Sequence, residues 1–267
     1  MSASFYQRLP DAIIIGVKKS GTSFLLSLVQ IHSNIAASEK EVFYFSNLKR
    51  KAQGVKYYKS RMTPSFPDQV TMEKSPKYWI TTDTPENVKR LNPKMKIILS
   101  VREPGCRVGS DFHYRSRPHG VANINFDEFV RSKNEKLDYY LEPSFYDKHF
   151  ENWLKSFPLN QIFIIRNEDM LIPEKLARVL RDLENFLKIP HEFYVNTTND
   201  KTCVTSHYQQ YLRKPRRPLL CFPHYDVINS TCSYDKRYKE TVDHLRKMFK
   251  PHVERFELLA KRKFNWF

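Results

Sequence analysis

The sequence lacks any apolar run long enough to cross a membrane, and it is poor in acidic residues. No stretch approaches the ~18 apolar residues of a membrane-spanning helix, and no signal peptide opens the chain. We therefore expect either a luminal domain trimmed of its anchor or a cytosolic variant. Only 29 acidic residues oppose 45 lysines and arginines, which gives a net charge of +16 and a pI near 9.6. This balance indicates a polyanionic partner or an anionic cofactor. Nucleic acid, acidic membrane and sulfated glycan all fit that sign.

Cysteine is also scarce, with four residues in 267, which is few for a disulfide scaffold. Three of them, Cys203, Cys221 and Cys232, lie in the C-terminal part, where glycosylation sequons begin at Asn196 and Asn229. Cysteines and sequons together favour a secretory compartment. The sequence offers no His/Cys cluster for a metal, and it has no internal repeats, so we expect a site that works without a metal.

A strand, a glycine turn and a helix follow one another near the N-terminus. Ala12–Ile15 is a short apolar run, long enough for one buried strand. Gly16–Thr22 then holds two glycines and two lysines, and apolar residues recur at helical spacing from Phe24 onward. Such a turn directs unpaired backbone N–H groups and the positive end of a helix dipole at one point. We therefore expect it to bind a phosphate or a sulfate.

This turn is close to a Walker A loop, G-x-x-x-x-G-K-[ST], because Gly16 and Gly21 have the right separation. Thr22 stands where the lysine should follow the second glycine, and a lysine occurs two places before that glycine, at Lys19. K-x-G-T-[ST] is the phosphosulfate loop of sulfotransferases, which binds the 5′-phosphosulfate of PAPS. The alternative is an ordinary glycine turn in an α/β sheet.

The remaining segments predict alternating strands and helices. Further strands are expected at Val70–Lys74, Met95–Arg102 and Ile162–Ile165. Helices are expected at Pro85–Leu91, after Pro104, and at Phe126–Ser132, Phe145–Ser156, Pro173–Lys188, Tyr238–Phe249 and Val253–Lys261. Lys49–Pro67 reads as loop, and Phe193–Tyr238 has no sustained periodicity. A chain of this length can bury about three quarters of its unfolded surface, so we expect one α/β domain, residues 1–267, around a central parallel sheet flanked by helices.

Seven segments, in order, resemble the heparan sulfate sulfotransferases, and most closely the glucosaminyl 3-O-sulfotransferases. They are AIIIGVKKSGT, SEKEVFYF, MEKSPKYWIT, LSVREPGCRVGSDF, SFYDKHFENWLKSFP, FYVNTTNDKTC and HLRKMFKPHVERFELLAKRKFNW. The resemblance implies a P-loop-like sulfotransferase fold with PAPS as cofactor. It implies a heparan-type glycan as partner rather than nucleic acid, and the Golgi lumen as location.

The resemblance also implies roles for residues at the cofactor. Lys19 matches the lysine that contacts the leaving phosphate and the transferring group. Arg102 and Ser110 match residues that hold the 3′-phosphate of PAPS, and a guanidinium suits this task because it offers paired donors. Donors to the 5′-phosphosulfate are expected from Ser20, Gly21, Thr22 and Ser23.

On the acceptor side, Glu41 matches the catalytic glutamate, and an acceptor hydroxyl or amine needs such a base. Lys74 matches a neighbouring lysine that reaches the substrate and shares in catalysis. We expect an open basic cleft here, with further acceptor contacts from Lys49, Arg50, Lys59 and Arg61.

Three departures from the family bear on specificity and closure. Phe43 and Ser46 stand where the 3-O enzymes have a histidine and an aspartate. The family's S-K-G-R loop over the cofactor is not recognisable, and Lys236 with Arg237, or the cluster at 213–217, are candidates to replace it. By the same resemblance Cys203 pairs with Cys221, or alternatively with Cys232, and Cys106 is expected to be a buried free thiol.

These inferences predict a PAPS-dependent sulfotransferase that acts on a heparan sulfate glucosamine 3-hydroxyl, with Glu41 as base. The alternatives are an N-sulfotransferase or other-acceptor member of the family, and a non-catalytic heparin-binding module. A nucleotide kinase would need an acidic Walker B residue after a strand, whereas ILSVREP continues with Arg102.

Overall fold

The centre of the fold is a parallel sheet of short, buried, apolar strands. The computed structural model describes residues 5–116, 125–132, 135–198, 200–206, 219–223 and 238–267. Five strands pair in the order β2-β3-β1-β4-β5, every pair parallel. They are β1 (Ala12–Gly16), β2 (Ile35–Ala37), β3 (Val70–Lys74), β4 (Lys96–Val101) and β5 (Ile162–Arg166). The expected parallel sheet is therefore confirmed, and only β2 among its strands was not anticipated.

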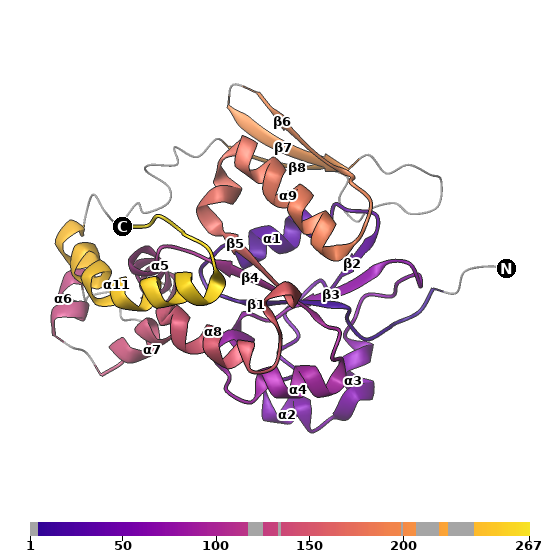
Figure 1. Cartoon of the computed structure of the whole chain (residues 1–267), viewed down its shortest axis with the longest axis horizontal. Helices are drawn as coiled ribbons and strands as arrows, with labels where there is room; N and C mark the ends of the chain where they lie inside the picture. Colours follow the sequence, from indigo (N-terminus) through magenta and orange to yellow (C-terminus); the bar gives the residue numbers. More distant parts are fainter. Residues whose placement is uncertain (1–4, 117–124, 133–134, 199, 207–218, 224–237) are drawn as a thin grey trace.

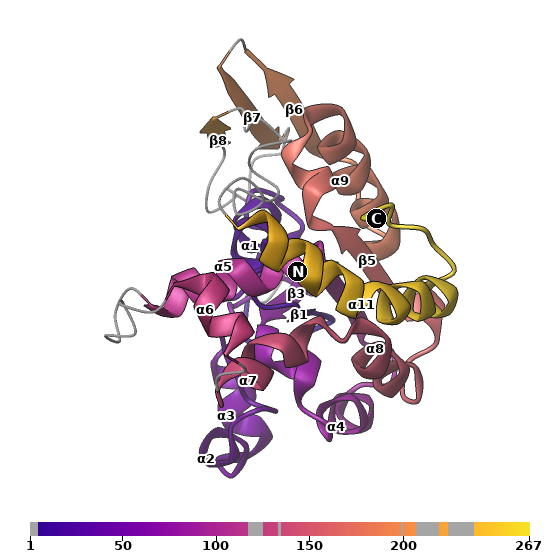
Figure 2. The same ribbon diagram turned by 90° about the vertical axis from the view of Figure 1, so that its left-hand side faces the viewer.

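Helices cover both faces of this sheet (Figures 1 and 2). Ala12 and Ile14 of β1 pack with α1 (Thr22–Val29) and α9 (Pro173–Leu187) on one face. Ile13 and Ile15 face the opposite layer, because successive side chains of a strand alternate. That layer contains α3 (Gly54–Ser60), α4 (Thr84–Leu91), α8 (Tyr146–Leu154) and the end of α11 (Lys239–Ala260). A further cluster joins α5 (Pro104–Ser116), α6 (Phe126–Arg131), α7 (Leu137–Leu141) and the start of α11.

The strand order creates a crevice between β1 and β4. The chain leaves β1 towards β2 and β3 on one side and returns to β4 on the other, so the connections after β1 and β4 diverge. Ligands of open α/β sheets bind at such points, outside the carboxyl ends of the strands. The β1–α1 loop is tied to β4 there, because Val17 N donates to Ser100 O (2.7 Å) and Ser100 Oγ donates to Ser20 O (2.5 Å).

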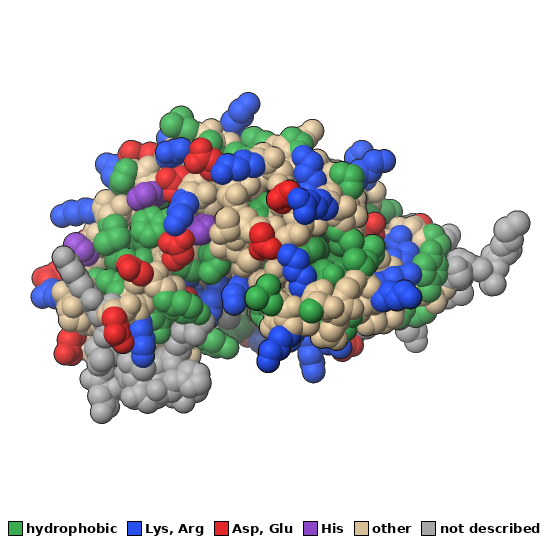
Figure 3. Space-filling model, turned by 90° about the horizontal axis from the view of Figure 1, so that it is seen from below, with side chains coloured by type: hydrophobic (Ala, Val, Ile, Leu, Met, Phe, Trp, Pro, Cys, Tyr) green, Lys and Arg blue, Asp and Glu red, His purple; other side chains and the backbone are tan. Residues whose placement is uncertain are grey.

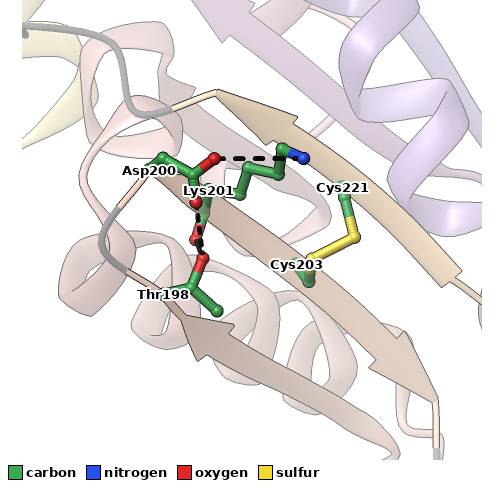
Figure 4. The surroundings of a disulfide bond; sticks show 5 residues. All are labelled: Thr198, Asp200, Lys201, Cys203 and Cys221. Carbon is green, nitrogen blue, oxygen red and sulfur yellow. Dashed lines mark hydrogen bonds and ion pairs between the residues drawn. A yellow bond between two sulfur atoms is a disulfide. The ribbon is translucent and has the colours of Figure 1, made fainter.

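A small antiparallel sheet lies beside α9 (Figure 2) and holds a disulfide (Figure 4). It consists of β6 (Phe193–Thr197), β7 (Lys201–Ser206) and β8 (Leu219–Pro223). Cys203 and Cys221 are opposite each other in the β7–β8 register and are bonded, so the pairing of Cys203 with Cys221 is confirmed. Cys106 is buried and is itself disulfide-bonded, so the expectation of a free thiol there is wrong.

Two predictions of secondary structure are also wrong. The segment expected as loop contains α2 (Leu48–Lys51) and α3, since the Asn47 side chain caps α2 by accepting from Arg50 N and Tyr58 is fully buried. The two expected terminal helices are one, α11, with Pro251 inside it. Phe249 and Phe256 are buried in two different clusters, and this burial outweighs the backbone hydrogen bond lost at the proline.

In the described part of the chain, no helix is long and apolar enough to span a membrane.

Candidate functional site

The β1–α1 loop is built closely against the end of β5. Gly21 has φ 76°, a left-handed conformation, and a Cβ there would lie 2.1 Å from Asn167 Oδ1. Lys19 is also left-handed, with φ 69°. No side chain among the described residues caps α1, and no acidic residue occurs in its first turn. The amides at the start of α1 are therefore left to an external acceptor, and an anion suits them.

A cavity of about 830 Å³ opens at this end of the sheet and gathers most of the predicted site residues. Those that line it are Lys19, Gly21, Thr22, Ser23, Glu41, Arg102 and Ser110. Ser20 and Lys74 do not line it. Ser20 is fully buried within the loop and Lys74 is nearly so behind Glu41. Apart from Ser20, the residues expected at the cofactor thus share one cavity with the expected base.

Two cations occupy the crevice between β1 and β4. Arg102 directly follows β4, and its Nη1 donates to Lys19 O over 3.4 Å. Lys19 Nζ lies 3.9 Å from the ring centroid of Tyr114, which α5 presents at the surface. This cation–π contact holds the ammonium group beside the cavity.

A buried ion-pair chain fixes the other side of the loop. Lys18 Nζ lies 2.5 Å from Asp111 Oδ1, and Asp111 Oδ2 accepts from Arg107 Nη1 over 3.2 Å. Arg107 is fully buried and also donates to Lys18 O (3.3 Å) and Ser144 Oγ (2.5 Å). Each buried charge has an opposite partner, as burial requires. The chain ties the loop backbone to α5.

Glu41, Lys74 and Ser23 form a contact between the acceptor side and the loop. Lys74 Nζ lies 2.7 Å from Glu41 Oε1 and donates to Ser23 Oγ over 3.0 Å. The Lys74 side chain is 5% exposed and that of Glu41 is 35% exposed. One buried ammonium group therefore orients a partly exposed carboxylate and contacts the first turn of α1.

Two buried carboxyl groups stand close to the cavity without lining it. Glu73 at the end of β3 is fully buried, and burial raises its pKa to about 7 against hydrogen bonds from Ser75 and Tyr58. Glu103, just after β4, accepts from the amides of Gly105 and Cys106. Burial raises its pKa to about 7 as well, and the Arg246 charge opposes the rise.

The four cations expected at the acceptor do not line the cavity. The Arg50 guanidinium donates to Val42 O and lies 5.6 Å from the Phe43 ring. Lys59 Nζ lies 5.9 Å from the Tyr6 ring, and Lys49 and Arg61 are exposed on or beside α2 and α3. Lys and Arg side chains are spread over the face seen in Figure 3, so charge alone does not mark a glycan site. The candidates for the cofactor lid, at 213–217 and 236–237, lie outside the described residues.

Sequence reasoning missed several residues of the cavity wall, including Phe24, Lys77, Tyr139 and Asn167. Asn167 directly follows β5, so the rule that led to Arg102 after β4 would also have found it. Lys77 follows Pro76 in the segment after β3. Tyr139 is carried by α7, and no motif in the sequence marks it.

Comparisons with known proteins all identify sulfotransferases as similar to this chain. The model of the sulfotransferase domain family matches residues 9–217. Heparan sulfate glucosamine 3-O-sulfotransferase 5 of Mus musculus is 30% identical over 280 positions, covering 97% of this chain and 75% of the relative. Heparan sulfate glucosamine 3-O-sulfotransferase 3B1 of Mus musculus is 28% identical, covering 97% and 65%. A sulfotransferase from Alicyclobacillus acidocaldarius superposes with a TM-score of 0.68 at 19% identity, covering 96% of this chain and 98% of that one, and so shares the fold.

Proposed function

This chain belongs to the sulfotransferase domain family, and we propose that it transfers a sulfuryl group from PAPS to the glucosamine 3-hydroxyl of heparan sulfate. The observation that carries the proposal is the meeting of the Lys19 loop, Arg102 and Glu41 around one cavity. Two relatives that are 30% identical over nearly the whole chain are named as heparan sulfate glucosamine 3-O-sulfotransferases, which supports this choice of acceptor.

The residues of the loop fit an anionic nucleotide cofactor. Ser20 Oγ is buried and has no hydrogen-bond partner among the described residues, which is unusual for a buried hydroxyl. The start of α1 is uncapped within the same part of the structure, and Lys19 and Arg102 supply positive charge. When bound, PAPS supplies the sulfuryl group and is converted to adenosine 3′,5′-bisphosphate. Its 5′-phosphosulfate would be held by Lys19, Ser20, Gly21, Thr22 and Ser23, and its 3′-phosphate by Arg102 and Ser110.

The acceptor side would supply base catalysis. Glu41 accepts the proton of the attacking hydroxyl, and Lys74 holds that carboxylate in place through the 2.7 Å ion pair. Lys19 and the α1 amides stabilise negative charge that develops on the transferring and leaving oxygens. Since Lys74 also contacts Ser23, the same ammonium group aligns the base with the loop.

A second candidate is transfer to a different group, such as a glucosamine amine. Phe43 lines the cavity beside Glu41 in place of the histidine of the 3-O enzymes. Ser46, in place of the aspartate, has a buried Oγ with no partner among the described residues. Phe43 can pack against a sugar ring but cannot exchange a proton, so the acceptor atom can differ from that of the relatives.

The test is PAPS turnover on heparan sulfate by the wild type and by Glu41→Gln, with mapping of the new sulfate. Glu41→Gln keeps the size of the side chain and removes the base, so we expect kcat to fall by about 10²-fold or more. Sulfate found on the amine would select the second candidate. Salt-sensitive heparin binding without turnover would identify a non-catalytic module.

A further inference from the structure

The end of β3 places two titratable side chains, Lys74 and Glu73, on opposite sides of the sheet. Lys74 contacts Glu41 and Ser23, whereas Glu73 is buried among Tyr58, Ser75 and Tyr78. No cation among the described residues pairs with Glu73; its contacts are hydroxyl groups. A buried carboxyl group without a cation is costly, so its presence here calls for a reason.

Ser75 connects this carboxyl group to the segment that carries Glu41. Ser75 Oγ donates to Glu73 Oε2 over 2.7 Å and accepts from two backbone amides, Val42 N (3.2 Å) and Phe43 N (2.8 Å). A hydroxyl group has one donor and two acceptor positions, and all three are used. Because Glu73 takes the only hydrogen of Ser75 Oγ, the lone pairs of that oxygen are turned towards the two amides.

The segment 41–43 needs such support. Phe43 has φ 53°, a left-handed conformation that is unfavourable for a non-glycine residue. Within this segment Lys74 contacts only the Glu41 side chain, and Arg50 holds the carbonyl oxygen of Val42. The two amide bonds to Ser75 fix the backbone directly after Glu41.

We propose that Glu73 is a positioning residue of the acceptor site, which acts through Ser75 and the amides of Val42 and Phe43 to hold Glu41 and Phe43 at the cavity. The inference rests on the proposed function, since it takes Glu41 as the base. Lys74 and Glu73 then support the segment 41–43 from two faces of one strand. Lys74 contacts the side chain of Glu41, and Glu73 acts through Ser75 on the backbone amides of Val42 and Phe43.

Three variants separate positioning from stability. Glu73→Met keeps the volume but removes the carboxyl acceptor of Ser75, whereas Glu73→Gln keeps an amide oxygen that can accept from Ser75. Tyr58→Phe is the matched control, because it removes a different hydrogen bond to Glu73 (3.0 Å) and leaves the bonds of Ser75 intact. The readouts are kcat and KM for heparan sulfate, affinity for adenosine 3′,5′-bisphosphate, Tm, and hydrogen exchange of the Val42 and Phe43 amides.

We expect Glu73→Met to lower kcat by about tenfold or more and to speed exchange of both amides, with the bisphosphate affinity kept. Glu73→Gln and Tyr58→Phe should stay within about threefold of the wild-type kcat, an effect of less than about 1 kcal/mol. A wild-type kcat and wild-type amide exchange rates in Glu73→Met would overturn the proposal. Equal losses of kcat in Glu73→Gln and Glu73→Met would also overturn it. If the wild type transfers no sulfate, the proposed function fails, and amide exchange still decides whether Glu73 orders the segment.

Discussion

Lys74 Nζ lies 2.7 Å from Glu41 Oε1, and this ion pair joins a nearly buried cation to a carboxylate that reaches the cavity. The same ammonium group contacts Ser23 at the start of α1. The pair therefore links two segments far apart in sequence, the anion loop after β1 and the segment that carries the proposed base.

Replacing Lys74 should uncouple these two parts. In Lys74→Met the Glu41 carboxylate loses its orienting partner, so we expect kcat to fall by about tenfold to a hundredfold. The loss of stability should be about 1–2 kcal/mol, because Glu41 is partly exposed and solvent screens it. Steady-state kinetics and urea unfolding measure the two effects. Lys89→Met, at an exposed position on α4, is the control, and an equal loss of kcat there would contradict the assignment.

The close contact at Gly21 should make that position intolerant of any side chain. Gly21→Ala places a Cβ 2.1 Å from Asn167 Oδ1, so the loop must move, and we expect affinity for adenosine 3′,5′-bisphosphate to fall by at least about tenfold. Gly54 has the same φ of 76°, and a Cβ added there would meet nothing within 4 Å, so Gly54→Ala measures the conformational cost alone, roughly 1–2 kcal/mol. Similar affinities in the two variants would show that the loop does not bind the cofactor.

Replacing Ser20 by alanine should weaken binding of the bisphosphate without lowering the stability of the free protein. Its buried Oγ has no partner among the described residues, so Ser20→Ala removes an unsatisfied group, and the free protein should be as stable as the wild type or slightly more so. If the hydroxyl binds the cofactor, the affinity for the bisphosphate should drop by about three- to tenfold. Calorimetry and thermal unfolding test both parts. A destabilised free protein with normal affinity would reverse both expectations.

Stability should fall as the pH rises towards neutrality. Burial raises the pKa values of Glu73 and Glu103 from 4.5 to about 7, so between these values the folded chain retains protons that the unfolded chain releases. The stabilisation is complete below about pH 4.5 and is lost as the pH passes 7, by up to about 3 kcal/mol per group. Urea unfolding at pH 5 and pH 8 should show a smaller drop for Glu103→Gln than for the wild type. Equal drops would mean that Glu103 titrates normally.

The strands and the anion loop could be predicted because their signals are local. Apolar runs such as Lys96–Val101 mark buried strands, and the spacing of Gly16, Lys19 and Gly21 marks the loop. The continuous helix through Pro251 could not be predicted, because packing of Phe249 and Phe256 into two clusters overrides the local signal. Strands β6 to β8 lack a clear period, since their residues are unevenly buried.

The cations expected at the acceptor show that sequence does not predict the direction of a basic side chain. Net charge and clusters of basic residues do not say which way a side chain points. Arg50 donates to Val42 O, and Lys59 lies against Tyr6 rather than at the cavity. Their contact with an acceptor stays a prediction. Lys77 lies in the segment MEKSPKYWIT, where only Lys74 was assigned a role, yet Lys77 lines the cavity.

The measurement that tests the central claim most directly is calorimetric titration with adenosine 3′,5′-bisphosphate, compared with Mg²⁺–ATP, for the wild type and for Lys19→Ala and Arg102→Ala. The account predicts binding of the bisphosphate that each substitution weakens by about tenfold or more, since charge-assisted bonds to phosphate contribute about 1.5–3 kcal/mol. It predicts weaker binding of Mg²⁺–ATP. If the wild-type protein does not bind the bisphosphate, or binds Mg²⁺–ATP more tightly, the result would contradict the claim that the loop between β1 and α1 binds PAPS.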